Sequence, residues 1–342
     1  MGVAAERIVE VEHLLGEALA RRGVHGADAE FVVADLISAQ LEGKATHGIA
    51  KILLLDAALL ERQGEPVVRR RHSGMAMVDG RRQIGQLAGR FCAELAIELS
   101  TESGTGLVAL TNTGRFGRLA PYGGLIADQG LVGFVTNNAG PPVVAPFGSI
   151  DPILGTNPFC FAFPGRRASV VVDVSTAERV WSEVRGAVLN ARRLPPGAFL
   201  DGDGCLTEDA DSAASVLPFG GHKGSALCLA LELLVGVLTG AKMGLEVGGE
   251  YELGAVFLAV DPSALVPHGD PEAAVERLVN SVRASRPAPG HDAVRVPGDR
   301  AAARREAALA AGVVEVDSAT MARLRRMAVS DEGGLEPSDR LN

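Results

Sequence analysis

Aromatic residues make up only 4% of the 342-residue chain, so its core has to be built from Ala, Val and Leu. The four cysteines, Cys92, Cys160, Cys205 and Cys228, form no CxxC pair, which excludes a redox dithiol and the usual zinc-ligand spacing. The formal charge of -9 argues against a general attraction to nucleic acid or anionic lipid. With 47% hydrophobic and 22% charged residues, the composition excludes disorder, collagen and a disulfide scaffold and indicates an ordinary globular protein.

The motifs of the common nucleotide-binding, hydrolase and metal sites are absent. The nearest approach to GxGxxG is Gly202-Asp203-Gly204, which has Thr207 in place of the third glycine. There is no GxSxG, no HExxH and no His pair at helical spacing. We therefore predict no metal site and no Rossmann dinucleotide fingerprint.

The sequence also shows no targeting or membrane segment. Residues 1–22 mix Glu, Arg and His into the apolar positions, unlike a signal peptide. The longest apolar run, residues 225–241, contains Glu232 and is short for a membrane span, so we predict a buried helix there. We expect a cytoplasmic protein that binds neither membrane nor nucleic acid.

Apolar periodicity divides the chain into a helical beginning and a mixed middle. We predict an all-helical N-terminal unit that ends near residue 72 and packs with helices in 300–342, and a mixed-sheet unit over 73–299. The predicted helices are 9–21, 28–41, 49–60, 86–99, 301–310 and 318–327, and the predicted strands are 106–112, 130–138, 159–163, 168–174 and 251–260.

Two polar clusters lie where helices or strands end. In the first, Thr46 and His47 stand between Gly43 and Gly48, and the imidazole together with Lys51 could hold a carboxylate. The alternative is a helix N-cap by Thr46 with an incidental His. In the second, residues 110–117 (LTNTGRFG) follow a strand, and Arg115 is either a ligand group or a solvated charge in a turn.

Three further clusters follow along the chain. Residues 137–158 are rich in Asn, Pro and Gly, which indicates a shaped loop wall or ordinary turns. Asp173 and Ser175 end a strand, where they could orient a His, bind ribose hydroxyls or cap the next helix. In residues 218–225 (PFGGHKGS), Lys223 precedes an apolar helix, and phosphate binding is the natural use of such a loop. The alternative is a plain glycine loop that binds nothing.

These five clusters, in this order, resemble the type-2 malate/L-lactate dehydrogenase family, which includes sulfolactate, ureidoglycolate and diketogulonate dehydrogenases and cyclic imino-acid reductases. The resemblance extends from about residue 3 to residue 327, and PFGGHKG and GTNP are its most specific blocks. It implies a mixed-sheet α/β fold unrelated to the Rossmann domain, hydride transfer with NADH or NADPH, a small carboxylate-bearing substrate and a homodimer with the active site near the subunit interface.

The resemblance also implies roles for individual residues. Thr46 and His47 fall on a substrate-contacting Ser-His pair, and Lys51 stands where an Arg usually grips the substrate carboxylate. The positions that contact the cofactor are Ala139, Asp173, Val174, Ser175, His222, Lys223, Gly298 and Asp299. Asp173 would in addition support His47 in catalysis.

Arg115 departs from the family pattern, because it stands where the general acid/base His is expected. A guanidinium does not exchange protons near neutral pH. Either His47 supplies the proton for a 2-oxo acid, or the substrate is an iminium, which needs none after hydride addition. The sequence therefore predicts a 2-oxo acid or 2-imino acid reductase in which Arg115 holds an anionic group. The alternative is a catalytically retired member that binds ligand or cofactor.

Overall fold

The computed structural model describes residues 3–189 and 191–330, which form two compact units. Unit 1 comprises Met1–Gly64, Arg82–Leu87 and Glu276–Asn342, and unit 2 comprises Glu65–Arg81 and Ala88–Val275. Residues 65–72, which we placed with the helices, lie in unit 2 because they enter its sheet. Residues 276–299, which we placed with the sheet, lie in unit 1, where Arg283 forms an ion pair with Asp299.

Unit 1 is a helical layer with one small antiparallel sheet. Helix α1 buries Ile8, Val11 and Leu15 at helical spacing, and these side chains share a core with α2, α3 and α11. The prediction of an all-helical unit was wrong, because β1 pairs with β12 from the other end of the sequence. The elements are β1 (Val3–Arg7), α1 (Ile8–Arg21), α2 (Gly26–Leu41), η1 (Ala45–His47), η2 (Ile49–Lys51), α3 (Ile52–Glu61), α10 (Asp299–Ala311), β12 (Val313–Asp317) and α11 (Ser318–Val329).

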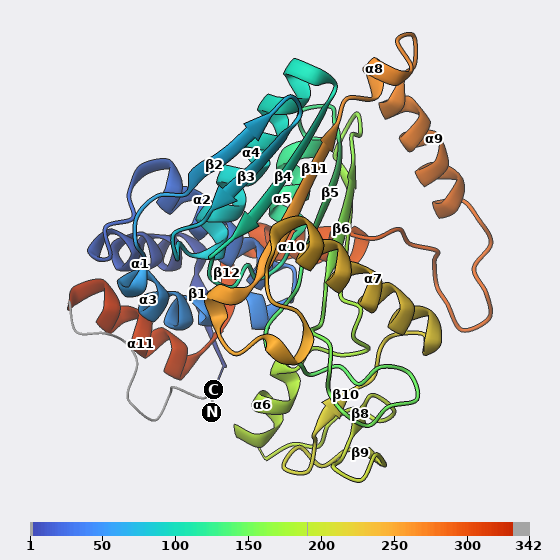
Figure 1. Ribbon diagram of the computed structural model, residues 1–342. Helices are drawn as coiled ribbons and strands as arrows, with labels where there is room; N and C mark the ends of the chain where they lie inside the picture. Colours follow the sequence, from blue (N-terminus) through green and yellow to red (C-terminus); the bar gives the residue numbers. More distant parts are fainter. Residues whose placement is uncertain (1–2, 190, 331–342) are drawn as a thin grey trace. The chain divides into compact units, whose positions relative to one another are not determined.

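Unit 2 is built on a seven-stranded sheet of order β2-β3-β4-β11-β5-β6-β7, in which only β3 and β4 pair in parallel (Figure 1). A smaller sheet has the order β10-β8-β9. The mixed-sheet α/β fold is therefore confirmed. The strands are β2 (Val67–His72), β3 (Met75–Asp79), β4 (Thr105–Thr111), β5 (Val132–Asn137), β6 (Phe159–Phe163), β7 (Val170–Val174), β8 (Phe199–Leu200), β9 (Leu206–Thr207), β10 (Ser215–Val216) and β11 (Gly254–Val260).

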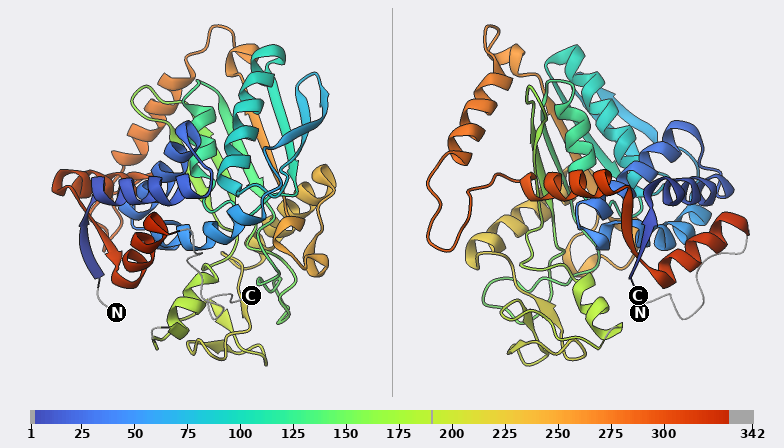
Figure 2. Two further views of the ribbon diagram at one scale, coloured as in Figure 1. Left: turned by 90° about the vertical axis from the view of Figure 1, so that its left-hand side faces the viewer. Right: turned by 180° about the vertical axis from the view of Figure 1, so that it is seen from behind.

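One face of the large sheet is covered by α4 and α5, which lie in front of it in the right-hand view of Figure 2. Gly106 faces α4 so closely that a Cβ there would meet the Ala96 carbonyl oxygen at 1.9 Å. Phe257 contacts Tyr122 of α5 on this same face, with ring centroids 5.9 Å apart. The helices of unit 2 are α4 (Gly85–Ser103, whose first turn lies in unit 1), α5 (Ala120–Ala127), α6 (Ser182–Leu189), α7 (His222–Thr239), η3 (Gly244–Glu246), η4 (Glu250–Glu252), α8 (Pro262–Leu265) and the first turn of α9 (Pro271–Arg283).

Helix α7 packs on the opposite face of the sheet. Its inner side buries Cys228, Leu231 and Val235, but Leu233 and Val237 are exposed. The prediction of a buried helix was therefore correct for one side only, because hydropathy counts apolar residues without showing which side they occupy. Among the described residues, α7 is long and apolar enough to cross a membrane by length and composition alone.

Candidate functional site

The polar clusters of unit 2 meet at one edge of the large sheet. Strands β4, β5 and β7 run in the same direction, since each is antiparallel to a strand that lies between them. Their last residues, Thr111, Asn137 and Val174, therefore lie at the same edge, and the register pairs Phe159 with Val174 there. The loops that carry Arg115, Ala139 and Ser175 all leave from this edge.

Arg115 is directed outward by its neighbour in the loop after β4. Phe116 is 2% exposed and contacts Tyr122 edge to face, with centroids 5.8 Å apart, whereas Arg115 is exposed. Arg185 of α6 lies close enough to be affected: burial lowers the pKa of Arg185, and the charge of Arg115 lowers it further. Two cations therefore gather at this edge of the sheet.

Asp173 holds the start of α5. Its Oδ2 accepts hydrogen bonds from the backbone N–H groups of Leu119 and Ala120, both at 2.9 Å. A carboxylate at this end of a helix is favoured by the helix dipole. The capping alternative was thus assigned to the wrong helix: Asp173 caps α5, which precedes it in sequence, and not the α6 that follows.

A buried network fixes the loop before β6. Asn157, which is fully buried with φ of 30°, donates through Nδ2 to Glu232 Oε2 at 2.6 Å and to the Cys228 carbonyl at 3.1 Å. Its Oδ1 accepts from the N–H of Ala139 at 3.3 Å. Glu232 Oε1 accepts from the N–H of Gly244 at 2.8 Å. The single acidic group of α7 is therefore a structural anchor for the loop backbone at Ala139.

Ser175 and its neighbour tie β7 to the same loop. The hydroxyls of Ser175 and Thr176 both donate to the Thr156 carbonyl, at 3.1 and 2.9 Å. The N–H of Phe219 donates in turn to the Thr176 carbonyl at 3.0 Å. This chain of contacts places the segment before α7 beside the sheet edge, while Val174 remains 38% exposed.

The N-terminus of α7 presents a cation. Gly221, the N-cap residue, has φ of 64° and offers no side-chain cap, and both His222 and Lys223 are exposed in the first turn. A Cβ on Gly224 would meet the Phe219 carbonyl oxygen at 1.8 Å, so only glycine fits where the loop turns into the helix. The first turn of α7 therefore offers the positive charge of Lys223 and uncapped N–H groups, which are the groups that the predicted phosphate site requires.

The predicted substrate residues Thr46, His47 and Lys51 lie in unit 1, in two short 3-10 turns before α3. Thr46 is exposed, His47 is half-buried and Lys51 is 7% exposed. The N-cap alternative for Thr46 was wrong: α3 begins at Ile52, and neither it nor the 3-10 turns has a side-chain cap.

Gly298 and Asp299 also lie in unit 1, at the start of α10. Gly298 is the N-cap residue, with φ of 94°. Asp299 forms an ion pair with Arg283 at 2.6 Å, and this contact lowers the pKa of the carboxyl group. The carboxylate therefore has a structural partner within unit 1.

Comparison with known proteins decides the family. The malate/L-lactate dehydrogenase family model matches residues 7–325. The chain belongs to the malate/L-lactate dehydrogenase family. It is therefore an enzyme, an oxidoreductase.

The relatives of this family member include a hydroxy-acid dehydrogenase and a cyclic imino-acid reductase. The L-sulfolactate dehydrogenase of Methanocaldococcus jannaschii is 32% identical over 84% of this chain and 86% of its own. The delta(1)-pyrroline-2-carboxylate/delta(1)-piperideine-2-carboxylate reductase of Pseudomonas syringae pv. tomato is 31% identical over 89% of this chain and 92% of its own. The crystal structure of a dehydrogenase from Sinorhizobium meliloti superimposes with a TM-score of 0.88 at 28% identity, covering 96% of this chain and 99% of the other.

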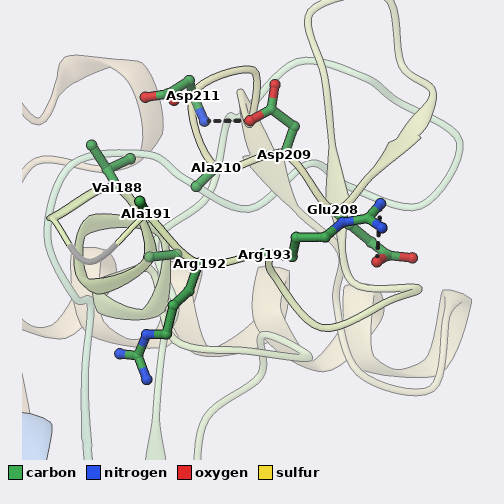
Figure 3. Close-up of a pocket in the computed structure, with 9 residues that line it drawn as sticks. Val188, Ala191, Arg192, Arg193, Glu208, Asp209, Ala210 and Asp211 are labelled. Atoms are coloured by element: carbon green, nitrogen blue, oxygen red, sulfur yellow. Dashed lines mark hydrogen bonds and ion pairs between the residues drawn. The ribbon is translucent and has the colours of Figure 1, made fainter.

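Two features of this malate/L-lactate dehydrogenase family member escaped the sequence reasoning. Arg185 was missed because nothing in its local sequence indicates that α6 brings it near Arg115. A pocket of about 380 Å³ was also missed; it lies between α6 and the small sheet, and none of the predicted site residues lines it. Figure 3 shows Arg193 turned toward Glu208 across this pocket while Arg192 points away.

Proposed function

We propose that this enzyme uses NADH or NADPH to reduce a C=O or C=N bond beside a carboxylate, in a 2-oxo acid or a cyclic or open 2-imino acid. The observation that carries the proposal is the family match over residues 7–325, with relatives named for 2-hydroxy acids and for cyclic imino acids. We also propose a homodimer, as the family resemblance implies.

The residues of unit 2 suit a nicotinamide dinucleotide. Lys223 and the uncapped first turn of α7 offer a positive charge and N–H donors to a phosphate. Asn137 is 5% exposed, and its Oδ1 accepts no hydrogen bond from the described residues, so it is available to an N–H donor such as a carboxamide. When bound, the reduced nicotinamide supplies the hydride. Ala139, Asp173, Val174, Ser175 and His222 of unit 2 are also proposed to contact the nucleotide. The family resemblance implies the same role for Gly298 and Asp299, which belong to unit 1.

We assign the substrate groups by charge. Lys51 holds the carboxylate beside the reacting carbon, although a Lys lacks the bidentate fork of the Arg usual at this position. Arg115, with Arg185 nearby, holds a second anionic group at the far end of the substrate. The guanidinium of Arg115 does not donate a proton near neutral pH, so His47 donates it to a 2-oxo acid, and an iminium substrate needs none.

The decisive experiment follows NADH and NADPH oxidation against paired substrates. The pairs are pyruvate with oxaloacetate and with 3-sulfopyruvate, each with and without methylamine, together with a cyclic imino acid. We expect kcat/KM to be at least about tenfold higher for substrates with a distal anion, since a charge-assisted hydrogen bond contributes about 1.5–3 kcal/mol. Equal turnover of pyruvate and its dianionic partners would refute the distal-anion assignment.

The Arg185→Gln variant tests whether Arg185 helps to bind the distal anion of the substrate or affects activity only through its charge. It should lower kcat/KM for the dianionic substrates about tenfold and leave that for pyruvate unchanged. The matched control is Arg192→Gln, an exposed arginine of the same region that points away from the neighbouring carboxylates in Figure 3. A loss of activity in the control of the same size would contradict a specific role for Arg185.

The retired alternative is motivated by Arg115, the cation in place of the expected acid. A retired member would bind nucleotide tightly and turn over no substrate in the panel. Arg115→His would then restore activity toward 2-oxo acids if the rest of the site is intact. Turnover by the unmodified enzyme would eliminate this alternative.

A further inference from the structure

The segment 137–139 at the end of β5 is held in place by its middle residue. Asn138 donates through Nδ2 to the Lys242 carbonyl at 2.8 Å and accepts through Oδ1 from the N–H of Gly254 at 2.7 Å. Its own carbonyl accepts from Asn137 Nδ2 at 3.1 Å. Because Nδ2 of Asn137 faces a carbonyl oxygen, this amide cannot turn over, and its Oδ1 is the atom that accepts nothing from the described residues. Asn137 therefore presents an acceptor and no donor.

The amide of Asn157 has its orientation fixed in the same way, by two acceptors. Its Nδ2 donates to Glu232 Oε2 at 2.6 Å and to the Cys228 carbonyl at 3.1 Å. The reverse orientation would place Oδ1 against a carboxylate and a carbonyl, which repel it. Oδ1 is therefore turned toward the N–H of Ala139, from which it accepts at 3.3 Å. Through Asn157, Glu232 determines which atom meets the backbone of the segment.

Close packing at Gly155 passes the position of Asn157 on to Ala139. A Cβ on Gly155 would meet Asn157 Oδ1 at 2.7 Å and the Ala139 carbonyl oxygen at 2.8 Å. It would also lie 3.2 Å from the Ala139 nitrogen. Since no empty space separates these groups, a movement of the Asn157 side chain has to displace the backbone of Ala139.

The charge of Glu232 strengthens this chain of contacts. Glu232 is 3% exposed and forms no ion pair with the residues that the structure describes. It is satisfied instead by Asn157 Nδ2 and by the N–H of Gly244, at 2.6 and 2.8 Å. A hydrogen bond to a buried charge polarises the donor group. The amide oxygen of Asn157 is thereby made a better acceptor for the N–H of Ala139.

We propose that Glu232 and Asn157 are positioning residues for the cofactor, which hold the segment 137–139 so that Asn137 Oδ1 accepts from the N–H of the nicotinamide carboxamide. The inference rests on the proposed function, because it requires a nicotinamide dinucleotide at this edge of the sheet. The buried Oδ1 has no hydrogen bond to give up when a donor reaches it, so the new bond contributes in full to binding.

The adenine amino group of the same cofactor is a competing N–H donor. The loop that carries Arg115 leaves from the same sheet edge as the loop that carries Ala139. Arg115 is assigned to the substrate, and hydride transfer requires the nicotinamide ring to lie against the substrate. The nicotinamide end of the cofactor is therefore the end that meets Asn137.

The test measures binding to the full chain by calorimetry, without turnover. The ligands are NADH, reduced 3-acetylpyridine adenine dinucleotide, which has an acetyl group without an N–H in place of the carboxamide, and ADP-ribose, which lacks the ring. Their 2′-phosphorylated forms replace them if NADPH binds more tightly. We expect the wild-type protein to bind NADH about tenfold more tightly than the acetylpyridine analogue, the value of one hydrogen bond.

Glu232→Gln should bring this ratio close to one and leave the affinity for ADP-ribose unchanged. Asn137→Ala should do the same, since it removes the acceptor itself. The matched control is Glu246→Gln, at an exposed carboxylate of the 3-10 turn after α7, which should keep the full ratio. All measurements are made at a temperature at which circular dichroism shows each variant to be folded, so a role in stability alone would leave the ratio unchanged.

A double variant, Asn157→Asp with Glu232→Gln, exchanges the amide and the carboxylate. The new glutamine donates to the new aspartate and accepts from the N–H of Gly244, while the aspartate keeps an acceptor for the N–H of Ala139. Of the contacts of the pair, only the donor to the Cys228 carbonyl is lost. We expect this double variant to recover most of the tenfold ratio that Glu232→Gln loses.

The outcomes separate this inference from the proposed function. Equal binding of NADH and the acetylpyridine analogue by the wild-type protein, a full ratio in folded Glu232→Gln, or no recovery in the double variant would overturn the inference alone. A loss of ADP-ribose affinity in Asn137→Ala would assign the oxygen to the adenine amino group instead. Failure of the wild-type protein to bind both ADP-ribose and NADH would overturn the proposed cofactor together with the inference.

Discussion

Replacing Glu232 by Gln tests the buried network that shapes the sheet edge. Both carboxylate oxygens accept hydrogen bonds, from Asn157 Nδ2 at 2.6 Å and from the N–H of Gly244 at 2.8 Å. Gln keeps one acceptor and turns an NH₂ group toward the other N–H, so one bond to a charged acceptor is lost and two donors face each other. A hydrogen bond to a charged group contributes about 1.5–3 kcal/mol, and an unsatisfied buried donor costs about 1–3 kcal/mol more.

We therefore expect Glu232→Gln to lower the free energy of unfolding of unit 2 by about 3 kcal/mol. For a unit of this size that corresponds to a fall in Tm of roughly 6–12 °C. The only tryptophan of the chain, Trp181, lies in unit 2 and contacts Phe199, so its fluorescence during thermal or urea unfolding reports on unit 2 specifically.

The control removes a carboxylate of the same region that has no buried partner. Glu246 is exposed in the 3-10 turn after α7, and Glu246→Gln should change stability by no more than about 0.5 kcal/mol. If Glu232→Gln unfolds together with the wild-type protein, the two hydrogen bonds are not what stabilises this carboxylate in the core, and the account of the loop at Asn157 is refuted.

Three further outcomes follow from the same structure. Lys223→Ala should raise the KM for the cofactor roughly 10- to 100-fold, the value of a charged hydrogen bond, with an unchanged Tm; an unchanged KM with a lowered Tm would remove Lys223 from the cofactor site. Titration with a thiol reagent at pH 8 should count one accessible thiol, Cys205, in the folded protein and four after denaturation, because the other three are buried; a second fast thiol would contradict that burial. Burial raises the pKa of Cys228 from 9.0 to about 11, so the protonated thiol favours the folded state, and roughly 3 kcal/mol of stability should be lost as pH rises from about 9 to 11; Cys228→Ser should make that slope shallower.

The central strands could be predicted well because the apolar pattern of each one lies within its own stretch of sequence. The strand predicted at 159–163 is β6, and those at 106–112 and 130–138 match β4 and β5 to within two residues. The β1–β12 pair was missed because its partners lie at opposite ends of the sequence. Strand β2 was missed because three consecutive arginines conceal it, a composition that suits a sheet edge.

The site, like the fold, could be predicted from the sequence only where a local pattern reveals it. Polar residues that follow apolar strands were found because strand ends are visible in sequence, and the common direction of β4, β5 and β7 then places them at one edge. Arg185 and Glu232 act through tertiary contacts: one stands near Arg115, and the other binds Asn157 from a different element. Such contacts depend on how α6 and α7 pack, which no local pattern specifies.

Asp173 has two assigned roles, a structural one as the cap of α5 and a predicted one in catalysis. Its Oδ2 already accepts two backbone N–H groups at the start of α5, so Asp173→Ala should cost about 2 kcal/mol, twice the usual value of one cap. Asp173→Asn keeps an acceptor oxygen for the same N–H groups and should stay within about 1 kcal/mol of wild type. A residue that only caps α5 would leave the kcat of the Asn variant unchanged. We expect instead that kcat falls more than about tenfold and that its pH profile shifts, because removing the charge changes the field on a proton donor in the reaction. A fully active Asp173→Asn enzyme would show that Asp173 serves the fold alone and would remove it from the catalytic assignment.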